Sequence, residues 1–246
     1  MSRISGTTQR FWDSFSNDYD AFQQGDAPGR IVNHLVDEDI LNPGSSILEV
    51  GAGPGTYTHL LSPRVRHITA TDVSKRMLDM NREKACMMHL NNITFVHDDW
   101  NNHVPIGGHD VCMMAFVPGS DSQESIMRME EESDICIIIS WNTNHGEEIT
   151  QRIKRKLGIG WPHPSHDLSL ELLKSEGRSA ERTVFDVEMN GTLPYDYVFE
   201  KELSRFRSAG IDATEACREI LSDMCQEGVF RYEFRNKINV TYWHAD

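Results

Sequence analysis

A chain of 246 residues is long enough to bury the core of one large α/β domain, and we expect a single domain over residues 1–246. Its 24 Lys and Arg against 38 Asp and Glu give a net charge of −14, which repels polyphosphate chains and anionic lipid surfaces and disfavours nucleic acid as a partner. The N-terminal segment is polar and no apolar run is as long as a bilayer span, so a cytoplasmic protein without membrane contact is expected.

The first 42 residues predict a helical cap. An aromatic stripe at helical spacing marks one face of its first helix and comprises Phe11, Phe15, Tyr19 and Phe22. A second helix is expected from about Gly29 to Asp39, ending before the Asn-Pro-Gly turn at 42–44.

Residues 43–141 alternate short apolar runs with stretches long enough for helical crossovers. The runs predict strands at 45–50, 67–72, 93–98, 110–116 and 134–141. This alternation is typical of a parallel, doubly wound sheet.

The part from 142 to 246 departs from simple alternation. It predicts helices at 147–157, 168–177, 198–209 and 213–226, and strands at 181–189 and 229–243. The irregular stretches 142–166 and 190–227 are candidates for a lid over the sheet edge. The cysteines form no CxxC pair, so free thiols are expected rather than a disulfide frame or zinc site, at Cys86, Cys112, Cys136, Cys217 and Cys225.

A glycine-rich loop follows the first strand in "ILEVGAGPGT" (47–56). Glycine lets a backbone approach a ligand closely and tolerates positive φ. Asp72 closes the second strand, where a carboxylate can accept hydrogen bonds from both ribose hydroxyls. The loop and the acid together predict a nucleoside site.

The spacing of the loop selects among nucleoside cofactors. A dinucleotide fold requires GxGxxG, whereas Gly51, Gly53 and Gly55 give GxGxG, with Glu49 two residues ahead. A carboxylate at this point repels pyrophosphate but suits an ammonium or sulfonium group. The spacing therefore favours a cationic ligand.

Three motifs resemble those of the class I S-adenosylmethionine-dependent methyltransferases of small-molecule type. They are "ILEVGAGPGTYT" (47–58), "ITATDVSKRMLDM" (68–80) and "ITFVHDDW" (93–100), within a resemblance over residues 11–141. The resemblance implies S-adenosyl-L-methionine as cofactor. It also implies a Rossmann-like, mostly parallel seven-stranded sheet, with strand 181–189 pairing antiparallel with the C-terminal strand and with helical inserts that form a lid.

The resemblance also implies roles for individual residues. Glu49 and the loop Gly51, Ala52, Gly53 and Gly55 would surround the methionine moiety, and Asp72 would bind the ribose. The residues implied around the adenine are Val73, Met77, Asp99 and Trp100. "HDDW" departs from the family pattern, so either Asp98 or Asp99 meets the adenine amine, and Asp99 is favoured. Tyr19 is a cofactor-contact candidate, with plain helix packing as the alternative.

The acceptor is expected near the ends of the fourth and fifth strands. Phe116, Trp141 and Asn142 are candidates for its walls, although core packing explains the aromatic residues equally well. "AFVP" (115–118) lacks the Asn/Asp-Pro-Pro-aromatic sequence of methyltransferases that act on exocyclic amines of nucleic acids or on glutamine, so such acceptors are less expected.

His145, His163 and His166 are the candidates for a general base, if one is used. "HPSH" (163–166) has metal-like spacing, but no further ligands accompany it, so no metal is expected. Three functions remain open: a small-molecule methyltransferase, an NAD-dependent oxidoreductase, and a non-catalytic S-adenosylmethionine-binding protein.

Overall fold

The computed structural model describes residues 9–10, 12–13, 25–142, 148–159, 169–208 and 210–245. All five strands predicted for the core are present, each within one residue of the predicted bounds. They are β1 (Ser46–Val50), β2 (His67–Asp72), β3 (Ile93–His97), β4 (His109–Ala115) and β5 (Ser133–Trp141). β1 is buried throughout and β2, β4 and β5 over more than half their length, whereas the residues of the edge strand β3 are half-buried or exposed.

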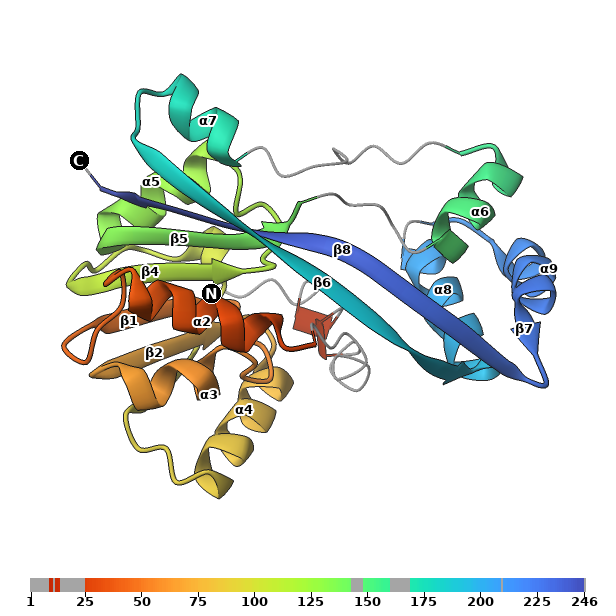
Figure 1. Ribbon diagram of the computed structural model, residues 1–246, viewed down its shortest axis with the longest axis horizontal. Coiled ribbons are helices and arrows are strands. Elements are labelled where there is room, and N and C mark those ends of the chain that lie inside the picture. The colour runs from red at the N-terminus through yellow and green to blue at the C-terminus, as the bar shows by residue number, and fades with distance from the viewer. Residues whose placement is uncertain are drawn as a thin grey trace. The chain divides into compact units, whose positions relative to one another are not determined.

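The sheet has the order β3-β2-β1-β4-β5-β8-β6, and the two-residue β7 (Cys225–Gln226) pairs with β8 (Val229–His244). The pairs among β1 to β5 are parallel and the C-terminal strand β8 is antiparallel, as predicted; its pairing with β5 was not predicted. The edge strand β6 (Ala180–Pro194) neighbours β8 and runs in the opposite direction to it (Figure 1). The sequence predicted β6 only as far as 189, so the structure extends this strand.

Helices cover both faces of the parallel part of the sheet (Figure 1). One face carries α2 (Ala27–Asp37), α3 (Thr58–Leu61) with the 3₁₀ turn η2 (Ser62–Arg64), and α4 (Lys75–Met87); the other carries α5 (Gln123–Glu132) and α7 (Ser169–Ser175). α2 begins two residues before the predicted Gly29, because Pro28 fits the first turn of a helix, where its missing N–H is not needed. Between β3 and β4 lies only the 3₁₀ turn η3 (Trp100–Asn102).

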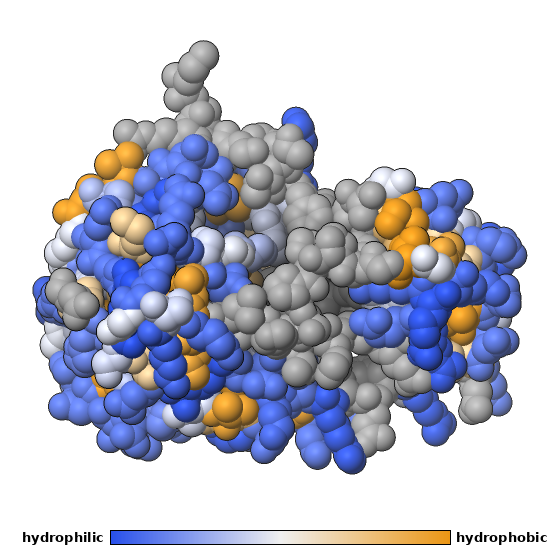
Figure 2. Space-filling model, turned by 90° about the horizontal axis from the view of Figure 1, so that it is seen from above, coloured by the Kyte–Doolittle hydropathy of each residue, from blue (hydrophilic) through white to orange (hydrophobic). Residues whose placement is uncertain are grey.

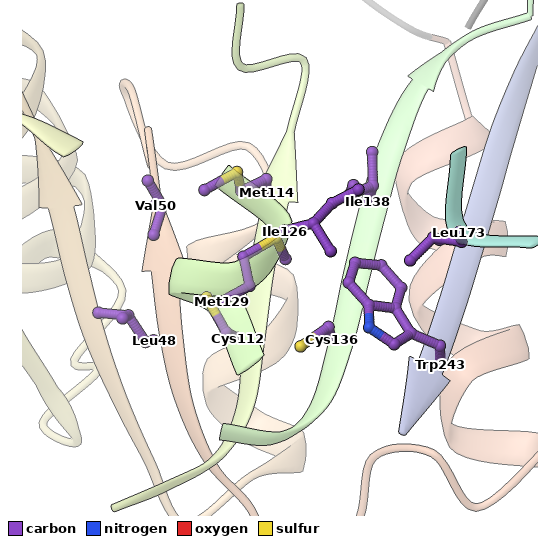
Figure 3. Packing of buried hydrophobic residues seen from close by; sticks show 10 residues of the cluster. All are labelled: Leu48, Val50, Cys112, Met114, Ile126, Met129, Cys136, Ile138, Leu173 and Trp243. Carbon is purple, nitrogen blue, oxygen red and sulfur yellow. The ribbon is translucent and has the colours of Figure 1, made fainter. Parts of the chain in front are cut away.

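Alternate residues of the strands pack beneath α5 and α7 (Figure 3). Leu48 and Val50 of β1 face this side, so Ile47 and Glu49 face α2, α3 and α4. The buried cluster comprises Leu48, Val50, Cys112, Met114, Ile126, Met129, Cys136, Ile138, Leu173 and Trp243. This packing fixes β1 rigidly, which positions the loop at its carboxyl end.

Contacts divide the chain into two compact units. The first consists of Met1–Asn142, Asp167–Phe185 and Lys237–Asp246, and the second of Thr143–His166 and Asp186–Asn236. The second unit contains α6 (Glu148–Leu157), α8 (Tyr195–Ser208) and α9 (Thr214–Met224), which share a buried apolar cluster of their own. It includes the whole predicted insert 190–227 and all but the first residue of 142–166. The role of the inserts as a lid stays a prediction.

Hydrophilic residues predominate on the face of the molecule seen in Figure 2, with hydrophobic residues in small separate groups. Among the described helices, none combines the length and apolar character needed to cross a membrane. All five cysteines are free thiols, and Cys112 and Cys136 lie buried side by side on β4 and β5.

Candidate functional site: a glycine loop with two buried carboxylates

The loop after β1 requires its glycines. Gly51, Gly53 and Gly55 have φ values of +67°, +54° and +97°, a region that side chains with a Cβ rarely adopt. A Cβ on Gly55 would lie 2.4 Å from the His59 ring, and a Cβ on Gly51 would lie 2.6 Å from a methyl group of Val117. The three predicted glycines therefore allow a tight turn packed directly on its neighbours.

Glu49 precedes this loop and is only 2% exposed. Its Oε2 accepts a hydrogen bond of 2.6 Å from the Thr58 hydroxyl on α3. Burial raises the pKa of Glu49 to about 8, the Thr58 hydrogen bond opposes this rise, and the nearby charge of Asp72 adds to it. The protonated form of Glu49 is therefore favoured at neutral pH.

Asp72 ends β2, the strand next to β1, and lies beside the same loop. Its two oxygens accept hydrogen bonds from the backbone N–H of Gly53 (2.8 Å) and of Ser74 (2.7 Å). Burial raises the pKa of Asp72, and these two backbone hydrogen bonds oppose the rise. Since each carboxylate oxygen has two lone pairs, both can still accept a hydroxyl.

The two carboxylates have the character of a site for a positively charged nucleoside. Among the residues that the structure describes, no lysine or arginine forms an ion pair with Glu49 or Asp72. The buried Asn81 Oδ1 accepts no hydrogen bond and lies against Gly55. A ligand that brings an ammonium group and ribose hydroxyls would satisfy this chemistry, whereas pyrophosphate would be repelled.

The residues predicted around an adenine differ in accessibility. Val73 is half-buried and follows β2 directly, whereas Met77 on α4 is 2% exposed. Ser74 caps α4 by accepting from the N–H of Met77, and its hydroxyl donates to Asp13 at 2.6 Å. Asp13, which sequence reasoning missed, thus anchors the short described part of the N-terminal segment beside the site.

The two acids of "HDDW" occupy different environments. Asp98 pairs with His103 Nδ1 at 2.5 Å, whereas Asp99 is 2% exposed and caps η3 by accepting from the N–H of Asn101 at 3.1 Å. Trp100 stacks on His103 with ring centroids 5.1 Å apart. The roles of Asp99 and Trp100 toward an adenine stay predictions.

A partly buried network behind this turn, centred on the buried Glu132, was not foreseen. His103 Nε2 also contacts Glu132 at 2.7 Å, and Glu132 accepts from the N–H groups of Ile106 (2.8 Å) and Gly107 (3.2 Å). The network closes the short β3–β4 connection onto the end of α5. Its members are far apart in sequence, which is why no local pattern predicted it.

The predicted acceptor-wall residues do come together. The rings of Phe116 and Trp141, at the ends of β4 and β5, lie with centroids 4.9 Å apart. Phe116 has a φ of +58°, an uncommon value for a bulky residue, of the kind that concentrates at functional sites. Asn142 donates through Nδ2 to the side chain of Asn239 at 2.8 Å.

Four candidates, Tyr19, His145, His163 and His166, lie outside the described residues, as do Phe11, Phe15 and Phe22. Within the described ranges, no group of three or more His, Cys, Asp or Glu side chains could hold a metal ion.

Comparisons with known proteins agree with this geometry. Residues 47–130 match the family model described as a methyltransferase domain. A protein-L-isoaspartate O-methyltransferase of Sodalis glossinidius is 24% identical over 129 residues, 52% of this chain and 60% of the relative. One from Photorhabdus laumondii is 23% identical over 126 residues, 51% of this chain and 59% of the relative. This chain thus spans less than two thirds of the length of these relatives.

Solved structures share the fold. Magnesium protoporphyrin IX methyltransferase from Synechocystis PCC 6803, solved with bound SAH, superposes with a TM-score of 0.53 at 16% identity, covering 87% of this chain and 81% of that one. A Bacillus halodurans protein described as a methyltransferase gives a TM-score of 0.53 at 12% identity, with 87% and 98% covered. The matched region, the strand order and the glycine loop with its acids together resemble the class I S-adenosylmethionine-dependent methyltransferases, and the SAH bound in the Synechocystis structure agrees with S-adenosyl-L-methionine as the cofactor.

Proposed function

We propose that this protein transfers the methyl group of S-adenosylmethionine to a small-molecule acceptor. The observation that carries the proposal is the pair of buried carboxylates, Glu49 and Asp72, around a loop of positive-φ glycines, with no lysine or arginine ion-paired to either among the described residues. Such a site suits the charged amino-acid end and the ribose of this donor. It does not suit a dinucleotide.

Bound S-adenosylmethionine supplies an activated methyl group on a sulfonium, so the protein has to align the acceptor and exclude water. Glu49 and the loop 51–55 hold the methionine end. Asp72 accepts from the ribose hydroxyls, and Val73, Met77, Asp99 and Trp100 are proposed to surround the adenine.

On the acceptor side, Phe116 and Trp141 are proposed as the wall against which the acceptor packs. Their rings contact each other at the carboxyl ends of β4 and β5, the edge at which open α/β sheets bind ligands. Asn142, directly after Trp141, is a polar group at the same place. We therefore propose an acceptor with a flat, apolar portion.

A binding test separates the donor classes. S-adenosylhomocysteine should raise the melting temperature of the protein, whereas NAD should not. Stabilisation by NAD alone would instead support the oxidoreductase reading.

A transfer test separates an enzyme from a non-catalytic binder. Methyl-labelled S-adenosylmethionine should lose its label to pooled small-molecule metabolites with aromatic groups. An isoaspartyl peptide belongs in the same assay, because the similar curated proteins carry that name. Label on the peptide alone would overturn the small-molecule acceptor. Donor binding with no labelled product in either arm would indicate the non-catalytic protein.

A further inference from the structure

Glu49 is the end of a hydrogen-bonded chain buried between three elements. Thr58 on α3 and Asn81 on α4 are both 0% exposed. The Asn81 Nδ2 group donates to the Thr58 hydroxyl at 2.9 Å, and that hydroxyl donates to Glu49 Oε2 at 2.6 Å. No sequence motif pointed to this chain of contacts.

The direction of this chain follows from the chemistry of its members. The amide nitrogen of Asn81 can only donate, so the Thr58 hydroxyl oxygen accepts from it. The single hydroxyl proton of Thr58 therefore donates to Glu49. Oε2 of Glu49 therefore always meets a donor, and the carboxylate is held in one orientation. The backbone N–H of Thr58 also donates to this carboxyl, and its remaining lone pairs are open to a ligand.

The electrostatic surroundings of Glu49 oppose its ionisation. The negative charge of Asp72, at the end of β2, lies near Glu49. The residue on β4 that pairs with Glu49 is the uncharged Met113. His59, which follows Thr58, donates through Nε2 to the backbone oxygen of Asn81 at 3.2 Å when that nitrogen carries the proton. Burial lowers the pKa of His59, so at neutral pH it brings no compensating positive charge.

We propose that Thr58 and Asn81 are positioning residues that aim Glu49 at the positively charged amino group of the donor, and that Glu49 gives up its proton to solvent when this cation binds. This rests on the proposed function. The balance is simple, because the carboxylic acid becomes a carboxylate paired with the ammonium, and one proton passes to the buffer.

Calorimetry with S-adenosylhomocysteine, in two buffers of different ionisation enthalpy, counts the protons released. Because the pKa of Glu49 lies above 7, wild type should release most of a proton at pH 7 and only a small fraction of one at pH 9. Affinity should rise with pH between 6 and 8. Glu49→Gln should release no proton and bind with an affinity that does not depend on pH.

Substitutions of the two positioning residues test the second half of the proposal. Thr58→Val removes the donor and should lower affinity about 10-fold at pH 7, shift the pH profile of binding to higher pH and extend proton release to pH 9. Thr58→Ser should restore the wild-type profile. Asn81→Leu should shift the profile in the same direction by a smaller amount, and His59→Gln, the matched control, should leave the proton count unchanged.

Several results would contradict the proposal. If wild type binds S-adenosylhomocysteine and the heat does not depend on the buffer, the proton release is overturned. If the pH profile of Thr58→Val superposes on that of wild type, the positioning role is overturned. In both cases the proposed function stands. Wild type that does not bind S-adenosylhomocysteine overturns the proposed function as well. If Thr58→Val does not fold, as judged by circular dichroism, the comparison of wild type with Glu49→Gln decides the proton release and Asn81→Leu decides the positioning.

Discussion

Two glutamates on opposite faces of the sheet, the buried Glu49 and the partly buried Glu130, differ in what meets their charge. Glu49 faces α3 and α4, meets the hydroxyl and the backbone N–H of Thr58 but no lysine or arginine among the described residues, and has a pKa raised to about 8. Glu130 on α5 accepts from Arg178 and from Trp243. Burial alone would raise the pKa of Glu130, but the hydrogen bonds and charge of Arg178, together with Trp243, bring it below the ordinary value.

This difference helps to distinguish a buried carboxyl group that binds a ligand from one that stabilises the fold. Glu130 has its counterion within the protein, so its burial is compensated by the fold itself. Glu49 is compensated only when something else brings positive charge. Removing the charge of Glu49 should therefore stabilise the protein, whereas removing that of Glu130 should destabilise it.

The largest effect is expected for Glu49→Gln. Loss of a buried charge partner should weaken S-adenosylhomocysteine binding about 100-fold at pH 8, which is about 2.7 kcal/mol. Because the folded-state pKa lies above the ordinary 4.5, wild type loses free energy of unfolding as pH rises from about 4.5 through about 8. The variant lacks that loss, so the two melting temperatures should diverge in its favour between about pH 4.5 and about 8 and run parallel above that range; curves that stay parallel from pH 5 to 8 would contradict the comparison.

Gly55→Ala tests the loop that holds the two carboxylates. Its Cβ would meet His59 and the Asn81 side chain within 2.5 Å, at a φ of +97°. Overpacking and backbone strain together should lower the free energy of unfolding by about 2–3 kcal/mol, measured by urea denaturation. Gly29→Ala is the control, since nothing lies within 4 Å of its Cβ position, and it should not destabilise. Equal effects would show that the loop adapts.

Glu130→Gln should destabilise without touching the donor site. The variant leaves Arg178 half-paired, and since both side chains are 17–18% exposed, we expect a loss of about 1–2 kcal/mol at pH 7. The wild-type contribution is present above the ordinary pKa and is lost as pH falls through the lowered one, so the two proteins should converge in acid. S-adenosylhomocysteine affinity should stay the same. Glu124→Gln, 80% exposed, should cost less than about 0.5 kcal/mol.

The smallest effect concerns the backbone of Phe116. Phe116→Ala and Phe116→Gly both lose the ring contact with Trp141, but only glycine relieves the positive φ. The glycine variant should therefore be the more stable of the two by about 1 kcal/mol in denaturant unfolding. If alanine proves equal or better, the turn is not under strain.

The sheet core could be predicted because its signals are local. Five apolar runs, the GxGxG spacing and the acids at the ends of the first two strands are each readable in a dozen residues. Parallel topology then brings Glu49 and Asp72 to the same edge without further information.

The rest depends on contacts between elements distant in sequence. Thr58 and Asn81 are 23 positions apart, and only the packing of α3 against α4 brings their side chains together. The His103–Glu132 contact and the positive φ of Phe116 are likewise consequences of tertiary packing. The composition and periodicity of the sequence do not reveal such contacts. Asp13 was missed because a lone acid in a helix usually faces solvent.

The burial of the thiols has a practical consequence for labelling. Burial raises the pKa of Cys136 to about 12, of Cys217 to about 11 and of Cys112 well above its ordinary value, so these sulfurs stay protonated and unreactive. Cys86 is exposed near the end of α4, the helix that carries Asn81. A maleimide fluorophore should therefore attach there first in the unmodified chain, placing an optical reporter on the helix whose Asn81 donates to Thr58.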